Sequence, residues 1–290
     1  MDLIKLVIVT PAHNEADNIE NLAVNLASLK LNFEVKWIVV DDNSSDGTSQ
    51  ALRRTSFGKS AELVTASTSG RLIDGAAFAA WNMGIRRAYE IAPDFTHLMK
   101  LDADVILDSE YFLALEPLFL DRTIGILGGV IVRGGREQNL HVPGPVKIYS
   151  RACLESLQHL PLKPGFDVLD EVVASTQGFR VVVDTKAKIN LHRRIGKSQG
   201  ALHGRRRNGL ICRWVGYDPV YFLLHLARYT LRKPYIFGSL WMGFGFLTAG
   251  PSPYSHELRK IYAASQRKKL KQLCSNPVNF IFSTYSTKKR

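Results

Sequence analysis

Two carboxylates separated by one small residue, Asp102-Ala103-Asp104, are the strongest candidate for chemistry in this sequence. They follow an apolar run at strand spacing that begins at His97. Where a strand runs into a loop, residues i and i+2 point the same way, so both carboxylates are expected to face one site. Such a pair repels itself unless a cation lies between its members, and Mg²⁺ and Mn²⁺ prefer oxygen ligands. The alternative is a solvated Asp-x-Asp turn.

The segments before this pair predict the sheet that would position it. Residues 3–10 and 35–40 are continuous apolar, β-branched runs, typical of strands buried on both faces. A polar loop and a helical pattern follow each run, and the first helix carries one apolar stripe from Ile19 to Leu29. Alternating strands and helices predict a parallel sheet with right-handed crossovers, which binds ligands at the carboxyl ends of its strands.

The same alternation continues to residue 184. The further segments are expected strands at 62–66, 123–132 and 180–184, and expected helices at 76–91, 110–120 and from Pro164 to near Gly178. Asn14 is predicted to cap the first helix, and Ser45 or Asp46 the second. A dinucleotide-type Gly-x-Gly-x-x-Gly does not follow the first strand.

Composition bounds the class of protein. The 290 residues are 46% apolar and 22% charged, enough for one large folded domain or a domain with an appendage. The three cysteines are far apart and form no Cys-x-x-Cys, which disfavours a disulfide framework or a zinc ribbon and suits a reducing compartment. The first residues lack a basic region followed by a long apolar one, so we expect no signal peptide and a cytoplasmic location.

Charge is distributed unevenly along the chain. The net charge of +12 divides into 19 Lys+Arg against 2 Asp+Glu in residues 191–290, and 19 against 24 before them. The basic character therefore belongs to the C-terminal third, which predicts a polyanionic partner there, such as phosphate groups or an anionic membrane surface. Nucleic acid is not expected, because the cations are not interleaved with aromatic residues in a recognisable module.

Four motifs in order resemble the family 2 glycosyltransferases of the nucleotide-diphospho-sugar transferase (GT-A) fold. They are Pro11-Ala12-His13-Asn14-Glu15, the loop from Asp41 to Thr48, Asn82-x-Gly84, and Asp102-Ala103-Asp104. The resemblance covers about residues 3–190. It implies an α/β fold with a Rossmann-like, mostly parallel sheet flanked by helices. The catalytic region would span 1–195, with the nucleotide-sugar half at about 1–105 and the acceptor half at about 106–195.

The resemblance also implies roles for the residues of these motifs. Asp42, or its neighbour Asp41, would accept hydrogen bonds from the base, and Glu15 would lie near the base or ribose. Asp104 would bind the divalent metal, Mn²⁺ or Mg²⁺, with Asp102 close to the ribose or to the same ion. The implied donor-binding set is Pro11, Ala12, Asn14, Glu15, Asp41, Asp42, Ser44, Arg71, Asp74, Asp102 and Ala103. For Asp41 and Asp42 the alternative is helix capping, and for Arg71 a surface position.

The acceptor half should supply a base that takes the proton of the acceptor hydroxyl in an inverting transfer. The family's usual Glu-Asp pair is replaced here by Asp167-Val168-Leu169-Asp170-Glu171. Asp167 and Asp170 share a helix face, and either could be the base while the other caps the helix. Asp167 matches the family spacing to Gly178 slightly better. In related enzymes a histidine after the following strand completes the metal shell, which makes His192 a third candidate ligand.

The C-terminal region is expected to be an appendage at 196–290. Residues 196–207 hold glycines and cations, a composition that suits a basic lid loop or an ordinary solvated loop. Residues 217–250 are rich in aromatic and aliphatic side chains, but the uncharged part from Pro234 to Gly250 is only 17 residues long and holds four glycines. A membrane crossing is therefore marginal. Peripheral contact with an anionic membrane is favoured over simple packing on the catalytic region.

Together these features predict a metal-assisted, inverting glycosyltransferase of the hexosyltransferase class. It would move a sugar from a nucleotide-diphospho-sugar to an acceptor hydroxyl or a lipid-linked glycan, at the inner face of the cell membrane. One alternative is a nucleotidyltransferase that makes a sugar nucleotide, although a Gly-rich basic loop is missing after the first strand. The other is a catalytically silent, membrane-associated binding subunit.

Overall fold

The computed structural model describes residues 3–67, 75–133, 136–138, 141–191, 200–231 and 233–275. The chain divides into two compact units. Unit 1 comprises residues 1–162 and 174–193, and unit 2 comprises residues 163–173 and 194–290. Three of the implied site residues, Arg71, Asp74 and His192, lie outside the described residues.

Unit 1 is built on one sheet of nine strands. The strands are β1 (Lys5–Ala12), β2 (Glu34–Asp42), β3 (Glu62–Ala66), β4 (His97–Leu101), β5 (Val105–Leu107), β6 (Ile124–Arg133), β7 (Arg136–Gln138), β8 (Val146–Ser150) and β9 (Arg180–Leu191). Their order is β3-β2-β1-β4-β8-β6-β9-β5, with β7 on β6. The pairs among β3, β2, β1 and β4 are parallel, whereas β8 is antiparallel to both neighbours and β5 to β9.

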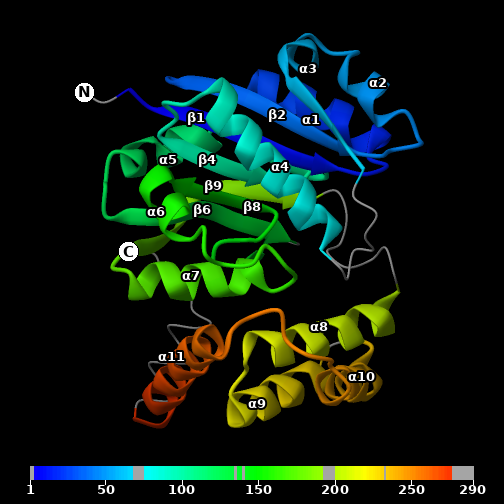
Figure 1. Ribbon diagram of the computed structural model, residues 1–290, viewed down its shortest axis with the longest axis vertical. Coiled ribbons are helices and arrows are strands. Elements are labelled where there is room, and N and C mark those ends of the chain that lie inside the picture. Colours follow the sequence, from blue (N-terminus) through cyan, green and yellow to red (C-terminus); the bar gives the residue numbers. More distant parts are fainter. Residues whose placement is uncertain are drawn as a thin grey trace. The chain divides into compact units, whose positions relative to one another are not determined.

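Helices cover both faces of this sheet (Figure 1). They are α1 (Ala16–Ser28), α2 (Thr48–Leu52), α3 (Ser56–Ser60), α4 (Ala76–Ile91), α5 (Tyr111–Phe119) and α6 (Arg151–Ser156). A further helix, α7 (Phe166–Thr176), starts in unit 2 and ends in unit 1. Leu6 and Ile8 of β1 belong to the core with Leu22 of α1. Val9 points the other way, and Gly84 lets α4 approach it closely, because a Cβ there would lie 2.2 Å from the Val9 side chain. The apolar runs of β1 and β2 thus reflect burial on both faces.

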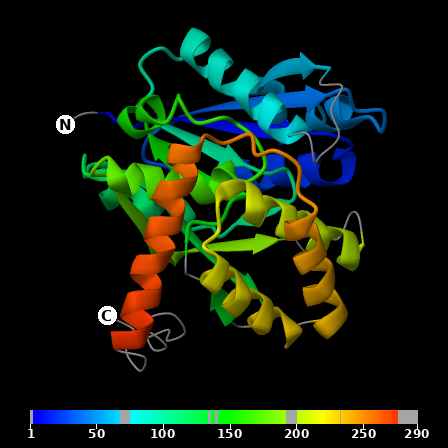
Figure 2. The same ribbon diagram turned by 60° about the horizontal axis from the view of Figure 1, so that its bottom comes forward.

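Unit 2 is helical. Besides the start of α7 it contains α8 (Ala201–Val215), α9 (Pro219–Thr230), α10 (Tyr235–Leu247) and α11 (His256–Ser275). Helices α8, α9 and α10 gather side by side, coloured yellow to orange in Figure 2. Gly209 of α8 and Gly245 of α10 allow the two backbones to touch, since a Cβ on either would lie within 2.0 Å of a carbonyl oxygen of the other helix. The Phe222 and Phe246 rings stack at 3.9 Å between α9 and α10.

The expected α/β fold with a mostly parallel sheet and a C-terminal helical part is confirmed. Two local predictions are wrong. Residues 201–207, expected in a loop, form the first turns of α8, because Ala, Leu and Arg favour helix and Gly200 ends the loop with φ 80°. Asn14 does not cap α1; its N-cap residue is Glu15, and the capping carboxylate comes from a different loop.

Candidate active site

The loops that follow β1 and β2 are tied together at the carboxyl edge of the sheet. Asn14 accepts a hydrogen bond from the Ser45 backbone N–H at 2.9 Å on its side-chain oxygen, and its own N–H donates to the Ser44 hydroxyl at 2.9 Å. The His13 Nδ1 lies 2.6 Å from the Asp42 carbonyl oxygen, so Nδ1 must carry the proton. Asn14 has φ 54°, a left-handed conformation that asparagine tolerates. The two loops therefore form one cradle, which we call the β1–β2 cradle (residues 13–15 and 43–47).

Asp46 fixes the first turns of two helices. One carboxylate oxygen accepts the Ala16 N–H of α1 at 3.0 Å, and the other accepts the Thr48 N–H of α2 at 3.0 Å. Burial acts to raise the pKa of Asp46, but the hydrogen bonds from the Thr48 hydroxyl and from these backbone groups outweigh it and hold the pKa below its ordinary value. Each bond satisfies an N–H that a helix start leaves without an internal partner.

The adjacent carboxylates Asp41 and Asp42 end β2 and are both buried, but the strand pleat points them to opposite faces. Asp41 accepts hydrogen bonds from the Ser44 N–H at 3.0 Å and from the Ser49 hydroxyl of α2. Both of its oxygens thereby hold the loop after β2 and the start of α2, although neither caps a helix N–H. Asp42 shares its face with Val40, the face that α4 covers.

The other implied nucleoside contacts lie along the same edge. Pro11 and Ala12 are the last residues of β1, paired with Val40 and Asp41 of β2. The Glu15 backbone N–H donates to the Thr48 hydroxyl at 2.9 Å, and its carboxylate accepts from the Asn18 side chain at 2.6 Å. The backbones of these residues are thus fixed by strand pairing or by hydrogen bonds to neighbouring loops.

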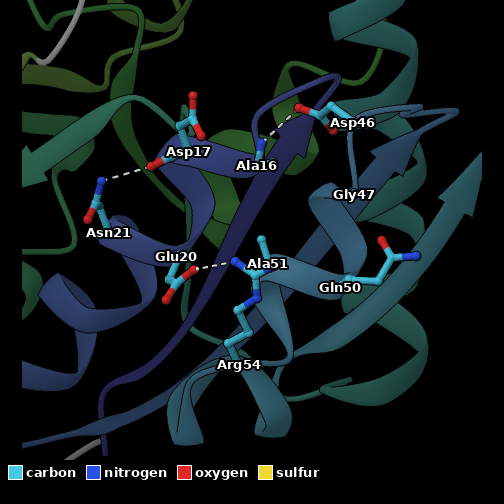
Figure 3. A pocket seen from close by; sticks show the side chains of 9 residues that line it. All are labelled: Ala16, Asp17, Glu20, Asn21, Asp46, Gly47, Gln50, Ala51 and Arg54. Atoms are coloured by element: carbon cyan, nitrogen blue, oxygen red, sulfur yellow. Dashed lines mark hydrogen bonds and ion pairs between the residues drawn. The ribbon is translucent and has the colours of Figure 1, made fainter.

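A shallow pocket of about 400 Å³ lies beside the cradle, between the starts of α1 and α2 (Figure 3). Its lining residues are Ala16, Asp17, Glu20, Asn21, Asp46, Gly47, Gln50, Ala51 and Arg54. Arg54 pairs with Glu20 at 3.2 Å, which leaves the pocket with a surplus of carboxylates from Asp17 and Asp46. A diphosphate would be repelled there, and no described residue of the implied donor-binding set lines the pocket.

The Asp102-Ala103-Asp104 motif forms the turn between β4 and β5. The Asp102 N–H donates to the Pro145 carbonyl at 2.9 Å, which anchors the turn to the segment before β8. Asp102 remains accessible, with 35% of its side chain exposed. The motif thus begins where β4 ends, at the same edge as the cradle, because β1 and β4 are parallel neighbours.

Lys100 forms an ion pair with Asp102 and donates to the Gly144 carbonyl at 3.2 Å. Lys147 lies directly opposite Lys100 in the β4–β8 ladder and is fully buried. These lysines were missed by the sequence analysis. The signal was present for Lys100, since a residue two before Asp102 on a strand points to the same face. Lys147 could be found only from the pairing of β8 with β4.

The described residues contain no group of three or more His, Cys, Asp and Glu side chains that could hold a metal. The described candidates for binding a cation are the two carboxylates of the motif, Asp102 and Asp104. Two hard oxygen ligands suit Mg²⁺ or Mn²⁺ in the mode in which substrate phosphates and water complete the shell. The described motif fits such an ion.

The two candidate base residues belong to unit 2 and differ in burial. Asp170 is fully buried and accepts the Glu171 N–H at 2.7 Å, whereas Asp167 is half-buried. Burial lowers the pKa of Arg207, and the Asp167 carboxylate opposes that shift. Burial, followed by the charges of Asp167 and Asp170, raises the pKa of Tyr254 well above its ordinary value. Of the two carboxylates, Asp167 is the more exposed.

The β1–β2 cradle, with α2 and α4 beside it, defines a class of protein. This class is an α/β enzyme whose acidic motifs meet at the carboxyl edge of a mostly parallel sheet. The family sequence model described as glycosyl transferase family 2 matches residues 7–160. The chain belongs to this family and is a glycosyltransferase.

Solved structures share the fold. The mannosyltransferase PcManGT from Pyrobaculum calidifontis, in complex with GDP-Man and Mn²⁺, is 19% identical with a TM-score of 0.57, over 96% of this chain and 83% of its own. TarS 1–349 from S. aureus, in complex with UDP, is 16% identical with a TM-score of 0.54, over 98% and 76%. Glucosyl-3-phosphoglycerate synthase from Mycobacterium tuberculosis, with Mn²⁺, UDP-Glc and phosphoglyceric acid, is 17% identical with a TM-score of 0.51, over 72% and 79%. No curated protein matches the sequence in the corresponding comparison.

Proposed function

We propose that this protein transfers a sugar from a nucleotide-diphospho-sugar to an acceptor hydroxyl, with inversion at the anomeric carbon and with the help of a divalent metal. The observation that carries the proposal is the meeting of three acidic elements at one edge of unit 1: Glu15, Asp42 and the Asp102-Ala103-Asp104 turn. The solved relatives hold GDP-Man, UDP or UDP-Glc, and two of them hold Mn²⁺.

In this proposal the β1–β2 cradle binds the nucleoside. Asp42 accepts hydrogen bonds from the base, because a carboxylate is an acceptor-only group. Pro11, Ala12, Asn14, Glu15 and Ser44 surround the base and ribose, and Asp41 supports them by holding Ser44 and Ser49. Arg71 and Asp74, from the segment before α4, are assigned to the diphosphate and sugar.

Asp104 and Asp102 would hold Mn²⁺ or Mg²⁺, with Ala103 beside the ribose and His192 as a further ligand. A bound divalent ion acts as a Lewis acid that neutralises the leaving diphosphate. Lys100 keeps Asp102 oriented by its ion pair and its bond to Gly144.

The base is assigned to Asp167, which takes the proton of the acceptor hydroxyl as that oxygen attacks the anomeric carbon. Its greater exposure supports this choice over Asp170, whose full burial fits a structural role. The catalytic region is assigned to residues 1–195 and the accessory region to 196–290. The acceptor is a glycan or a lipid-linked glycan, presented at an anionic membrane on the cytoplasmic side.

Donor binding is tested by thermal shift with UDP-, GDP- and dTDP-sugars, each with Mn²⁺ or with EDTA. A donor that binds the native state raises the melting temperature, and the proposal requires that the rise depend on metal and be lost in Asp104→Ala. No rise with any donor favours a catalytically silent subunit. The nucleotidyltransferase alternative predicts release of diphosphate from a nucleoside triphosphate and a sugar phosphate, which the same preparation can be assayed for.

Asp167→Asn and Asp170→Asn separate the two base candidates. Loss of the base should lower turnover by about 10²–10⁴-fold and leave donor binding intact. We expect this pattern for Asp167→Asn, whereas Asp170→Asn should lower the melting temperature. The opposite pattern would assign the base to Asp170. Nuclear magnetic resonance of the product anomer tests inversion directly.

A further inference from the structure

Helices α9 and α10 present most of the large apolar surface of the described residues. Fifteen large hydrophobic side chains of the described residues are exposed. Eleven of these come from α9, α10 and their connection: Val220, Leu223, Leu224, Leu231, Tyr235, Ile236, Phe237, Leu240, Trp241, Phe244 and Leu247. Phe237 is 72% exposed and Leu247 is 83% exposed. Eleven exposed large apolar side chains on two helices that pack on each other mark a docking or membrane surface, because a soluble protein normally exposes such side chains singly. We call it the α9–α10 surface.

The packing of α10 is inverted relative to an ordinary amphipathic helix. Its buried residues are small apart from one methionine: Gly238, Ser239, Met242 and Gly245. Its large side chains, such as Phe237 and Trp241, are exposed. A helix that folds against a core normally buries its large apolar side chains and exposes its polar ones. A helix that buries glycine and exposes phenylalanine lacks hydrophobic stabilisation in water. It gains this stabilisation only in an apolar medium.

Cations lie at the border of this surface, and acids are missing from it. The Arg205 guanidinium lies 4.2 Å from the centroid of the Tyr229 ring, and that of Arg206 lies 5.5 Å from the centroid of the Phe244 ring. Arg205 also donates to the Lys233 carbonyl at 3.1 Å. The sequence has no Asp or Glu from residue 219 to 256. Tryptophan, tyrosine and arginine around an apolar centre are typical of a helix that lies in the membrane interface.

The dimensions favour a shallow attachment. None of the helices described in the structure is both long and apolar enough to cross a membrane. Helix α10 has 13 residues and is therefore about 20 Å long, against a hydrocarbon core of about 30 Å. A helix of this length fits in the plane of the interface.

We infer that the α9–α10 surface inserts shallowly into an anionic lipid bilayer, with Phe237, Leu240 and Trp241 among the acyl chains and the arginines of α8 at the headgroups. A second copy of the chain fits less well, since a symmetric contact would place the same arginines against each other with no acid to compensate. The inference rests on the proposed function, which presents the acceptor at an anionic membrane, and adds which surface makes the contact. Insertion needs neither donor nor metal, so the two proposals are tested separately.

The test is flotation of the full-length protein with vesicles of phosphatidylcholine alone and of phosphatidylcholine mixed with phosphatidylglycerol. We expect the wild type to float with the anionic vesicles and to bind them at least tenfold more weakly at high salt. The double variant Phe237→Ser/Trp241→Ser should lose at least tenfold in partitioning, because two large apolar side chains no longer enter the bilayer. The matched control Val24→Ser/Leu120→Ser removes two exposed apolar side chains of unit 1 and should float like the wild type.

Tryptophan emission gives a second measurement. The emission of the wild type should shift to the blue and be quenched by brominated acyl chains when anionic vesicles are added, and the double variant, which lacks Trp241, should lose this response. Absence of flotation, or flotation of the double variant equal to the wild type, overturns the inference. The inference is also overturned if neither protein floats and sedimentation velocity shows that the wild type is a dimer and the double variant is not. Metal-dependent donor binding, measured in parallel by thermal shift, stays intact in the double variant whichever result is obtained, so the sugar-transfer proposal is judged separately.

Discussion

Asp41 and Asp42 are neighbours with the same charge and the same burial, yet the strand pleat gives them different partners. Asp41→Asn exchanges one acceptor oxygen for a donor that faces the Ser44 N–H or the Ser49 hydroxyl. We expect a loss of about 1–3 kcal/mol in the free energy of unfolding, measured by urea titration. Asp42→Asn should instead weaken donor binding by roughly tenfold or more with little loss of stability. If Asp41→Asn weakens donor binding in a fully stable protein, the two roles are reversed.

Lys100 places a positive charge beside one of the two candidate metal carboxylates. Lys100→Met removes a cation that competes with a divalent ion for Asp102. We expect the metal-free variant to melt at a lower temperature than the wild type. Mn²⁺ alone should stabilise the variant more than it stabilises the wild type. Equal stabilisation of both proteins by Mn²⁺ would show that Asp102 does not contact the ion. Lys36→Met, at an exposed pair with Glu34, is the matched control.

His97 should make stability depend on pH. Burial lowers the pKa of His97 to about 4, against an ordinary value near 6.5. Above pH 6.5 the imidazole is neutral in both states, and its neutral packing on the Phe119 ring contributes in full. As the pH falls from 6.5 to 4, the unfolded chain takes up a proton that the native state refuses, so stability is lost by up to about 3 kcal/mol.

His97→Gln should flatten this part of the pH dependence, measured as urea unfolding free energy between pH 7 and pH 4. The exposed His159, changed to Gln, should leave the slope as it is in the wild type. A slope that persists in His97→Gln would assign it to other groups.

At the scale of elements, one carboxylate holds the starts of α1 and α2. Asp46→Ala removes both caps, and each is worth about 1 kcal/mol, so a loss of roughly 2 kcal/mol is expected in urea unfolding. Asp17→Ala, in the first turn of α1, should cost only a few tenths. Because the pKa of Asp46 is lowered in the native state, its contribution is present above the ordinary carboxyl pKa and is lost as the pH falls through the lowered value. A loss no larger than that of Asp17→Ala would contradict the double cap.

The elements that the sequence predicts well are those whose burial follows from the local spacing of apolar residues. The apolar runs of β1 and β2 and the stripe of α1 needed only spacing to be recognised. The cap of α1 by Asp46 could not be predicted in this way, because the bond joins residues thirty positions apart. The continuation of β9 to Leu191 likewise depends on its pairing with β5, and Lys186 and Lys188 alone suggest an exposed loop.

The same limit applies to the site. Motif order indicated Asp42 and Asp104 without any structure. The sequence leaves Asp41 and Asp42, and Asp167 and Asp170, as open alternatives, because the members of each pair differ in burial or hydrogen bonds that depend on the fold. The sequence predicts a loop for the basic residues that end at Arg207, because adjacent cations are typical of a solvated segment. In the structure these residues belong to α8, where the Arg205 side chain and the Arg206 backbone and side chain pack against α10.

At the scale of the whole molecule, the balance of +17 in residues 191–290 lies almost entirely in unit 2. Like charges repel within it, and salt screens that repulsion. We expect higher salt to raise the melting temperature of unit 2 by a few degrees and to affect unit 1 little.

The tryptophans allow this to be measured, because Trp37 and Trp81 lie in unit 1 and Trp214 and Trp241 in unit 2. In Trp214→Phe/Trp241→Phe, emission reports only unit 1 while circular dichroism reports all helices. The dichroism transition should rise with salt more than the emission transition. Equal shifts would mean that the charge repulsion is not confined to unit 2.

The hydrogen bonds within the β1–β2 cradle couple its two loops, so that one loop cannot be replaced without the other. Asn14 is bonded to Ser44 and Ser45, and Asp46 to Ala16, so a change of length in one loop displaces the other. Transplanting one loop from a relative would leave the acceptors of the second without their donors. If the cradle binds the nucleoside as proposed, a change of nucleotide preference requires residues 13–16 and 43–48 to be replaced together.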